Sequence, residues 1–233
     1  IQAGKNTIAG FQHVFPEEAD LPRANRALIA WTRLAITGEG TAVPWEGAFA
    51  ISHTMRKLGH EESADIVLIM ADSYMRQGDW KMIQPEDITE EGQSVAISLG
   101  VAERGEATKT GFRQGVRIDR AFVAEIIKKH KRAAPKGSKI FRVQPRKFLE
   151  HWHQACDTLC YWPGPPHALR HLGPSYDLLV AYRTKPQVKQ RGRWAADASV
   201  QRYAKTHVYI AARAMLPDNV LRIAKQYMRL VDE

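Results

Sequence analysis

Cysteine is scarce in this chain, which holds only two cysteines among 233 residues. Cys156 and Cys160 stand four positions apart in a stretch of helical periodicity, so they predict no disulfide framework and a reducing compartment is expected. Long apolar runs are also missing. No segment approaches the length of about 20 residues that crosses a bilayer, and no signal peptide is visible. We therefore expect a protein that has no membrane partner.

Acidic residues are missing from two long stretches. The whole chain has 34 Lys and Arg against 25 Asp and Glu, a formal net charge of +9. Residues 128–147 contain no carboxylate, and residues 183–205 contain only Asp197. Because each neutralised phosphate releases counterions, such basic blocks are typical of proteins that bind a polyanion. A solvated basic surface is the alternative interpretation.

Helical periodicity dominates the chain, and 44% of the residues are apolar, enough to bury a core. Strand character is confined to the middle, at residues 94–99, 111–118 and 139–143. We therefore predict a mainly α fold with a small antiparallel β-sheet. The predicted helices are residues 24–36, 45–58, 61–75, 119–131 with Asp119 as N-cap, 145–160, 166–180, 185–190, 197–213 and 218–231.

Glycine and proline mark one plausible domain boundary, at about residues 38–44. Residues 1–42 are predicted to be the C-terminal remnant of a helical domain, and residues 43–233 are predicted to form a second domain. The chain begins at Ile1 and not at Met, so we expect further residues upstream.

Four potential metal ligands, His151, His153, Cys156 and Cys160, lie close together in the sequence. Zinc sites use these residue types, but all four fall on one predicted helix, and helical spacing cannot direct all of them at one ion. Two of them could supply half a site at most. We predict a packed helix face and no metal.

The stretch from Pro165 to Tyr203 contains the residue types that phosphodiester transfer needs. His167 and Arg170 are one helical turn apart, Trp194 follows in an Arg-rich turn, and Tyr203 lies nine residues later on a predicted helix. Transesterification requires charge neutralisation at two non-bridging oxygens, a nucleophile in line, and a proton donor for the leaving alkoxide. Arginine suits the first task because its planar guanidinium binds two oxygens and keeps its charge, so no metal is required.

Several short motifs resemble those of the tyrosine recombinases, which are site-specific DNA recombinases. Asp72-Ser-Tyr-Met-Arg76-Gln-Gly-Asp79 resembles their first motif, in which an arginine precedes an acidic residue by three positions. Thr108-Lys109-Thr110-Gly111, between two predicted strands, resembles the turn that carries their lysine.

The later motifs of the chain follow the same order. His167-Ala-Leu-Arg170-His171 resembles the family's His-x-Leu-Arg-His motif, and Gly192-Arg193-Trp194 with Tyr203 resembles its closing pair. Trp194 stands where most members carry histidine, and Asp79 stands where glutamate is commoner. The resemblance covers roughly residues 43–210.

The resemblance implies the tyrosine recombinase catalytic-domain fold and a role for each motif residue. Arg76 and Arg170 would hold the scissile phosphate, and Lys109 would protonate the leaving 5′ oxygen. Tyr203 would attack to give a 3′-phosphotyrosyl bond, while His167 would help to move its proton. Because the ester conserves the energy of the phosphodiester, rejoining would need neither ATP nor another cofactor.

Three further residues would support this chemistry. Trp194 would contact the phosphate or wall the pocket, since its indole donates only one N–H. Asp79 and His171 would orient Arg76 and the backbone near Arg170. The nearby Tyr209 is the competitor of Tyr203 as nucleophile, but its place one and a half turns further along the predicted helix would direct it elsewhere.

The resemblance also implies partners and a location. Double-stranded DNA would be the substrate, in the nucleus or nucleoid, and mobile elements are the commonest source of such enzymes. The last predicted helix, residues 218–231, would be exchanged between subunits of a tetramer on DNA, or else fold onto its own core. Two alternatives to a recombinase stay open: a type IB topoisomerase, and a domesticated DNA-binding protein that no longer cleaves.

Overall fold

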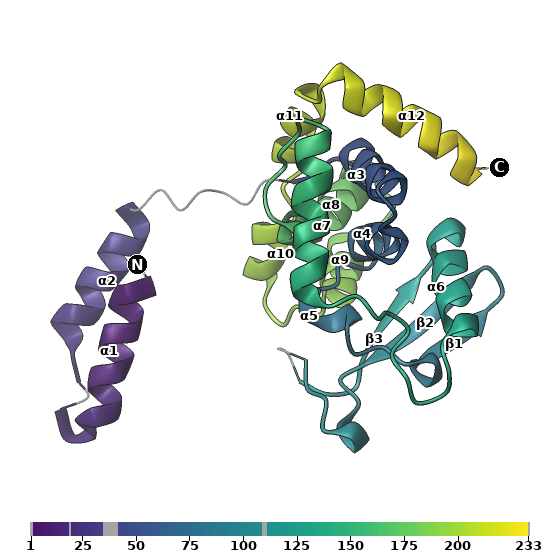
Figure 1. Ribbon diagram of the computed structural model, residues 1–233. Helices are drawn as coiled ribbons and strands as arrows, with labels where there is room; N and C mark the ends of the chain where they lie inside the picture. The colour runs from purple at the N-terminus through teal and green to yellow at the C-terminus, as the bar shows by residue number, and fades with distance from the viewer. Residues whose placement is uncertain (1, 19, 35–41, 109–110, 233) are drawn as a thin grey trace. The chain divides into compact units, whose positions relative to one another are not determined.

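The computed structural model describes residues 2–18, 20–34, 42–108 and 111–232 (Figure 1). The chain separates into two compact units, Ile1–Glu39 and Gly40–Glu233. In the first unit, α1 (Gln2–Val14) and α2 (Pro22–Leu34) are joined by a short 3₁₀ helix, η1 (Pro16–Glu18). The division between the units falls inside residues 38–44, and the assignment of the first unit as a remnant of a larger helical domain stays a prediction.

The second unit is mostly helical with a small antiparallel sheet, so the predicted fold class is confirmed. Most of the predicted helices lie within two residues of those in the structure. Its helices are α3 (Trp45–Lys57), α4 (Glu61–Ser73), α5 (Gln77–Trp80), α6 (Ala121–Ala133), α7 (Pro145–Thr158), α8 (Leu169–Leu179), α9 (Lys185–Gly192), α10 (Asp197–Tyr203), α11 (Thr206–Ala214) and α12 (Asp218–Asp232), with short 3₁₀ helices η2 (Pro85–Asp87), η3 (Ala102–Arg104) and η4 (Pro166–Ala168).

The sheet has three antiparallel strands in the order β1 (Ile88–Glu91), β2 (Ser94–Leu99) and β3 (Gln114–Ile118), with α6 beside it (Figure 1). Strand β2 was predicted, β3 begins three residues later than predicted, and β1 was missed because only its first residue is buried. The strand predicted at residues 139–143 is wrong. There the backbone N–H of Ile140 bonds the carbonyl of Ile83, and those of Arg142 and Val143 bond the carboxylate of Glu62, so no ladder forms.

Helix α4 is the buried centre of the second unit, since every residue from Ser63 to Ser73 is buried. It packs against α3, α6, α7 and α8. Gly173 of α8 lets this helix approach the C-terminal end of α4 closely, because a Cβ at position 173 would lie 2.2 Å from the Tyr74 ring. The two helix ends beside the motif residues, the C-terminal end of α4 and the N-terminal end of α8, are therefore held by the core.

The predicted helix at residues 197–213 is two helices, and the break comes directly after Tyr203. Helix α10 ends at Tyr203 and α11 begins at Thr206. The Ser175 hydroxyl of α8 donates to the Tyr203 carbonyl at 3.2 Å and accepts the Lys205 N–H at 2.9 Å. A side chain from another helix thus satisfies the backbone groups freed at the break.

The break separates the two candidate nucleophiles onto different helices. Tyr209, on α11, is 1% exposed, and its hydroxyl accepts the Trp45 backbone N–H at 3.2 Å. The structure therefore assigns Tyr209 to the core.

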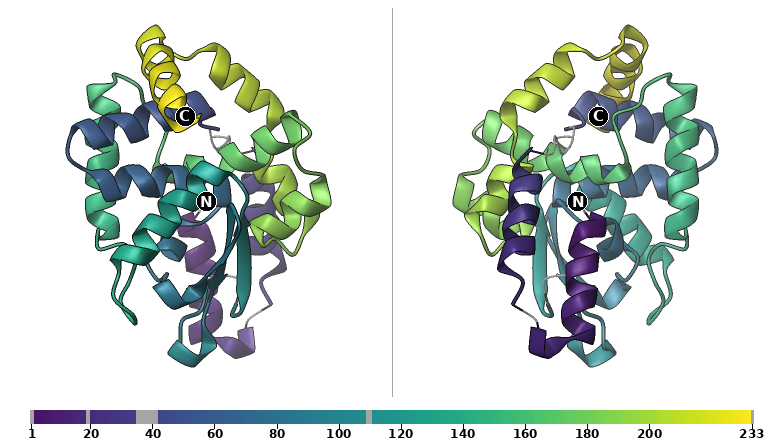
Figure 2. Two further views of the ribbon diagram at one scale, coloured as in Figure 1. Left: turned by 90° about the vertical axis from the view of Figure 1, so that its right-hand side faces the viewer. Right: turned by 90° about the vertical axis from the view of Figure 1, so that its left-hand side faces the viewer.

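Helix α12 packs on α3 of its own chain (Figure 2). Val220, Ala224 and Tyr227 are buried on this face, and Arg56 Nε donates to the Tyr227 hydroxyl at 2.7 Å. The single chain thus adopts the arrangement in which the last helix covers its own core, and exchange between subunits stays a proposal.

The potential metal ligands of α7 face different surroundings. Cys156 is buried in the core, while Cys160 is exposed beyond the end of the helix; both thiols are free. His151 bonds the Ser63 hydroxyl at 2.8 Å, and His153 contacts Trp162. Among the residues that the structure describes, no three His, Cys, Asp or Glu side chains form a group that could hold a metal ion.

No helix in the described part of the chain is both long and apolar enough to cross a membrane.

Candidate active site

Four of the predicted site residues come together from η4, α8, the α9–α10 connection and α10. The Trp194 and Tyr203 rings stack with their centroids 4.9 Å apart and 9° between their planes. The Arg170 guanidinium lies 5.2 Å from the centroid of each ring. The Tyr203 hydroxyl is 3.4 Å from Nε2 of the exposed His167. A phenol, an imidazole and a guanidinium therefore share one site.

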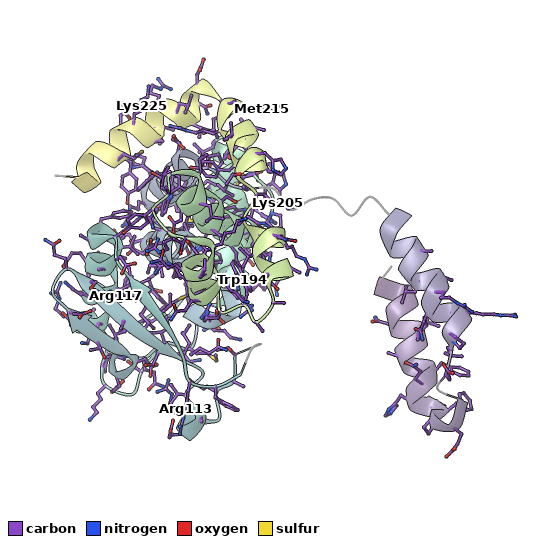
Figure 3. All side chains as sticks on the ribbon, turned by 180° about the vertical axis from the view of Figure 1, so that it is seen from behind. Arg113, Arg117, Trp194, Lys205, Met215 and Lys225 are labelled. Carbon is purple, nitrogen blue, oxygen red and sulfur yellow. The ribbon has the colours of Figure 1, made fainter. Side chains whose placement is uncertain are left out.

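The Trp194 ring packs against the backbone of Gly192, two residues earlier in the chain. A Cβ at position 192 would come within 2.4 Å of a ring atom. Figure 3 shows Trp194 in the connection between α9 and α10, on the same side of the second unit as Lys205. The indole stacks on the Tyr203 ring, while its role as a wall of a phosphate pocket stays a prediction.

Arg170 is the most deeply buried charge of the site, with no exposed surface. It donates from Nη1 to the Tyr74 carbonyl and from Nη2 to the Gly192 carbonyl, the latter at 2.8 Å. Burial, followed by the nearby Arg76 and Arg193 guanidiniums, lowers the pKa of Arg170 to about 10. Arg170 remains charged at neutral pH and therefore provides a fixed positive centre beside Tyr203.

Arg76 lies at the corner between α4 and α5. Tyr74 ends α4 in the left-handed conformation at φ 56°, which turns the chain toward the site. Arg76 precedes α5, and its backbone N–H donates to Asp79 Oδ2 at 3.0 Å. Arg76 is half-buried. Its charge lowers the pKa of Arg170, and only the burial of Arg170 contributes more to that shift. The two predicted clamp arginines therefore share one region of the protein.

Asp79 contacts two arginines of the site. Its Oδ2 accepts the Arg76 backbone N–H and also forms a buried ion pair with Arg193 Nη2 at 2.7 Å. Arg193 was not among the predicted site residues. The available signal was its position between Gly192 and Trp194 in a stretch poor in carboxylates.

His171 packs on the nucleophile candidate, with its ring centroid 4.7 Å from that of Tyr203. It is 6% exposed, and Nδ1 has no hydrogen-bond partner among the described residues. Burial, followed by the charges of His167, Lys205 and Arg170, lowers the pKa of His171 from 6.5 to about 4. His171 is therefore neutral in the folded protein at neutral pH.

This shift predicts an acid-dependent loss of stability. Between pH 6.5 and 4 the unfolded chain binds more protons at His171 than the folded chain does. The contribution of His171 to the free energy of unfolding is therefore fully present above pH 6.5 and is lost as the pH falls toward 4. At about 1.4 kcal/mol per pH unit, the full loss is about 3 kcal/mol. Urea unfolding at pH 7, 5.5 and 4.5 measures it. His171→Gln should show a smaller decrease than the wild type, and equal decreases would contradict the assignment.

A cluster of buried ion pairs holds the elements of the site together. Asp72 and Asp177 have no exposed surface, and Arg120 bridges them, with Nη2 2.8 Å from Asp177. Arg191 Nη2 lies 2.8 Å from the Asp72 carboxylate, and Arg183 pairs with Asp177. The pair of Arg191 on α9 with Asp72 on α4 holds these two helices together. Separating the helices would leave both charges buried without a partner, which is costly. This contact positions the residues that follow α9.

Asp119 belongs to the same cluster and is not a helix cap. Helix α6 begins at Ala121 with Arg120 as its N-cap, which corrects the prediction. The Asp119 carboxylate instead accepts a hydrogen bond from Arg183.

Lys109 lies outside the described residues, as does Thr110. Their neighbours in the turn between β2 and β3 are described: Thr108 and Gly111 form an isolated β-bridge. The role of Lys109 stays a prediction.

Several buried donors of the site have no partner among the described residues. They are Nε of Arg170, Nε and Nη1 of Arg193, and the indole N–H of Trp194. Buried polar groups are normally hydrogen-bonded, so donors concentrated in one place suit an anionic ligand. A cavity of about 610 Å³ lies beside α9 and α10 and is lined by Lys185, Lys189 and Val200, but by none of these donors. The unpartnered donors therefore mark the surroundings of Tyr203 as a candidate anion site.

Comparison with known proteins finds likeness in structure. No protein-family model and no curated protein sequence matches the chain. XerH site-specific recombinase bound to palindromic difH substrate, a post-cleavage complex, matches with a TM-score of 0.55, 14% identity and 75% of this chain covered. A pre-cleavage complex of XerH matches with a TM-score of 0.55, 15% identity and 74% covered. XerA recombinase matches with a TM-score of 0.52, 14% identity and 77% covered.

The chain covers 53% and 52% of the two XerH chains and 62% of the XerA chain. It therefore spans between half and two thirds of the length of these proteins. At these identities the likeness is one of fold.

Proposed function

We propose that this chain, which has the fold of a tyrosine recombinase catalytic domain, cleaves and rejoins DNA through a covalent bond to Tyr203. The observation that carries the proposal is the arrangement of Tyr203, with its hydroxyl 3.4 Å from His167 Nε2 and its ring against the Arg170 guanidinium. A nucleophile beside a proton acceptor and a fixed cation is what attack on a phosphodiester needs.

In the proposed reaction, Arg76 and Arg170 hold the non-bridging oxygens of the scissile phosphate. The Tyr203 oxygen attacks phosphorus as its proton leaves toward His167, and a 3′-phosphotyrosyl ester forms. The bond to the 5′ oxygen breaks, and Lys109 supplies the proton to that oxygen. Attack by a 5′ hydroxyl reverses these steps and releases Tyr203. One phosphate ester bond forms as another breaks in each step, so no ATP is consumed.

The wider biology follows from the same proposal. Double-stranded DNA is the partner, which places the protein in the nucleus or nucleoid, and a mobile element is its source. Residues 1–42 are the remnant of a helical domain that also binds DNA. Four copies assemble on two duplexes. In this tetramer α12 leaves the α3 of its own chain and packs on a neighbouring subunit. The cost of that exchange is the loss of the buried Tyr227 contacts with α3.

A pool of nicked DNA duplexes of randomised sequence tests the proposal. A nick near the cleaved bond lets the short 5′-hydroxyl fragment diffuse away, so cleavage traps the protein on DNA. We expect a covalent adduct that survives denaturant and is unaffected by a chelator. Absence of adduct across the whole pool would overturn the proposal. Relaxation of a supercoiled plasmid without preferred cleavage sequences would favour a topoisomerase instead.

A further inference from the structure

Arg193 occupies a backbone position that arginine rarely adopts. It is the residue after α9, at φ 55° and ψ 46°, the left-handed region in which helices usually end with glycine. A side chain other than glycine costs about 1 kcal/mol or more there and is found chiefly where the surroundings hold it for a function. The fold thus retains an arginine where glycine would be less strained.

The Arg193 guanidinium is buried but only partly used. Its side chain is 5% exposed, and Nη2 pairs with Asp79 at 2.7 Å. Nε and Nη1 are buried and have no hydrogen-bond partner among the described residues. A guanidinium has five N–H donors in a fixed plane, so one edge can bind Asp79 while another is presented to a second oxygen ligand.

The neighbours of Arg193 place this guanidinium in the active site. The preceding carbonyl, that of Gly192, accepts Arg170 Nη2, and the following residue, Trp194, stacks on Tyr203. Burial lowers the pKa of Arg193, and the Arg76 guanidinium lowers it further, against the opposing effect of Asp79. Arg193 also lowers the pKa of Arg170. Three guanidiniums thus lie close enough to repel one another, an arrangement that an anion between them would stabilise.

We propose that Nε and Nη1 of Arg193 bind a non-bridging oxygen of the scissile phosphate, which makes Arg193 a third arginine of the anion site. The inference rests on the proposed function and adds a phosphate-binding residue to it. Arg193 forms and breaks no covalent bond. It neutralises the negative charge that accumulates on the oxygens as Tyr203 attacks phosphorus.

Arg193→Gly is the variant of choice because glycine is favoured at this φ, so the backbone is relieved of strain. Arg202→Gln, at an exposed position on α10, removes one positive charge without touching the site and serves as the control. Arg193→Lys is the second variant, which keeps a charge near Asp79 but loses the planar edge. Circular dichroism establishes that each variant is folded.

The discriminating substrate carries a methylphosphonate at the cleaved position, in which a methyl group replaces one non-bridging oxygen and removes the charge. We expect Arg193→Gly to form adduct at least about 100-fold more slowly than the wild type on the phosphodiester. On the neutral methylphosphonate we expect a difference of less than about threefold, because there is less charge to neutralise. A merely structural role would slow both reactions equally, and that result would overturn the inference.

Binding of tungstate, a tetrahedral oxyanion, to the chain without DNA separates this inference from the proposed function. Calorimetry should show binding to the wild type and to Arg202→Gln, and binding at least about tenfold weaker in Arg193→Gly. Equal tungstate affinity and equal cleavage in Arg193→Gly would overturn the inference while adduct formation by the wild type still supports the proposed function. Weakened tungstate binding with no adduct in the wild type would support the anion site and contradict the proposed function.

Discussion

Tyr203→Phe is expected to abolish the covalent adduct between the chain and nicked DNA. The substitution removes only the hydroxyl oxygen, which is the attacking atom in the proposed reaction. The ring remains, so stacking on Trp194 and contact with Arg170 persist. We therefore expect unchanged DNA binding and stability, with adduct below the limit of detection on a denaturing gel.

Tyr209→Phe is the matched control for this prediction. The Tyr209 hydroxyl is buried and accepts the Trp45 N–H, so its removal should cost about 1 kcal/mol or slightly more in the free energy of unfolding. Adduct formation should remain because Tyr209 lies on a different helix from Tyr203. Adduct that persists in Tyr203→Phe and disappears in a folded Tyr209→Phe would reverse the assignment.

Arg170→Lys should have the second-largest effect, on activity and stability together. The lysine ammonium is a single charge without the planar fork, so it cannot reach the Tyr74 and Gly192 carbonyls as the guanidinium does. Each buried carbonyl left without a donor costs about 1–3 kcal/mol, so for the two carbonyls we expect the free energy of unfolding to fall by about 2–6 kcal/mol. Loss of a preorganised cation should slow adduct formation by about 100-fold to 1,000-fold or more.

Arg202→Lys, at an exposed position on α10, is the control, and both properties should remain near those of the wild type. Urea unfolding measures stability, and single-turnover cleavage is compared at a temperature where both variants are folded. Cleavage by folded Arg170→Lys within threefold of the wild type would contradict a role for Arg170 at the phosphate, whatever the change in stability.

The sequence was sufficient for the fold class, and it named four residues that the structure places side by side. Helical spacing alone places His167 and Arg170 on one side of a turn, whereas the pairing of Trp194 with Tyr203 follows from the family resemblance. The structure brings these four side chains together, although their chemical roles stay predictions.

Features that depend on distant parts of the chain could not be predicted. No glycine or proline interrupts residues 197–213, so periodicity continues through the break after Tyr203. The break depends on Ser175, a residue of α8. The pairing of Arg193 with Asp79 joins positions 114 residues apart, and the left-handed backbone at Arg193 has no local signature. Nearby residue types cannot show such contacts, because tertiary packing creates them.

The most direct test is to locate the attached nucleotide. Adduct from the nicked pool is digested with nuclease and trypsin, and the peptides are sequenced by mass spectrometry. Tyr203 and Tyr209 fall in different tryptic peptides, because Lys205 lies between them. The proposed function predicts a nucleotide phosphate on the peptide that holds Tyr203, joined through the tyrosine oxygen. The same mass on the peptide that holds Tyr209, or on any serine or histidine, would contradict it.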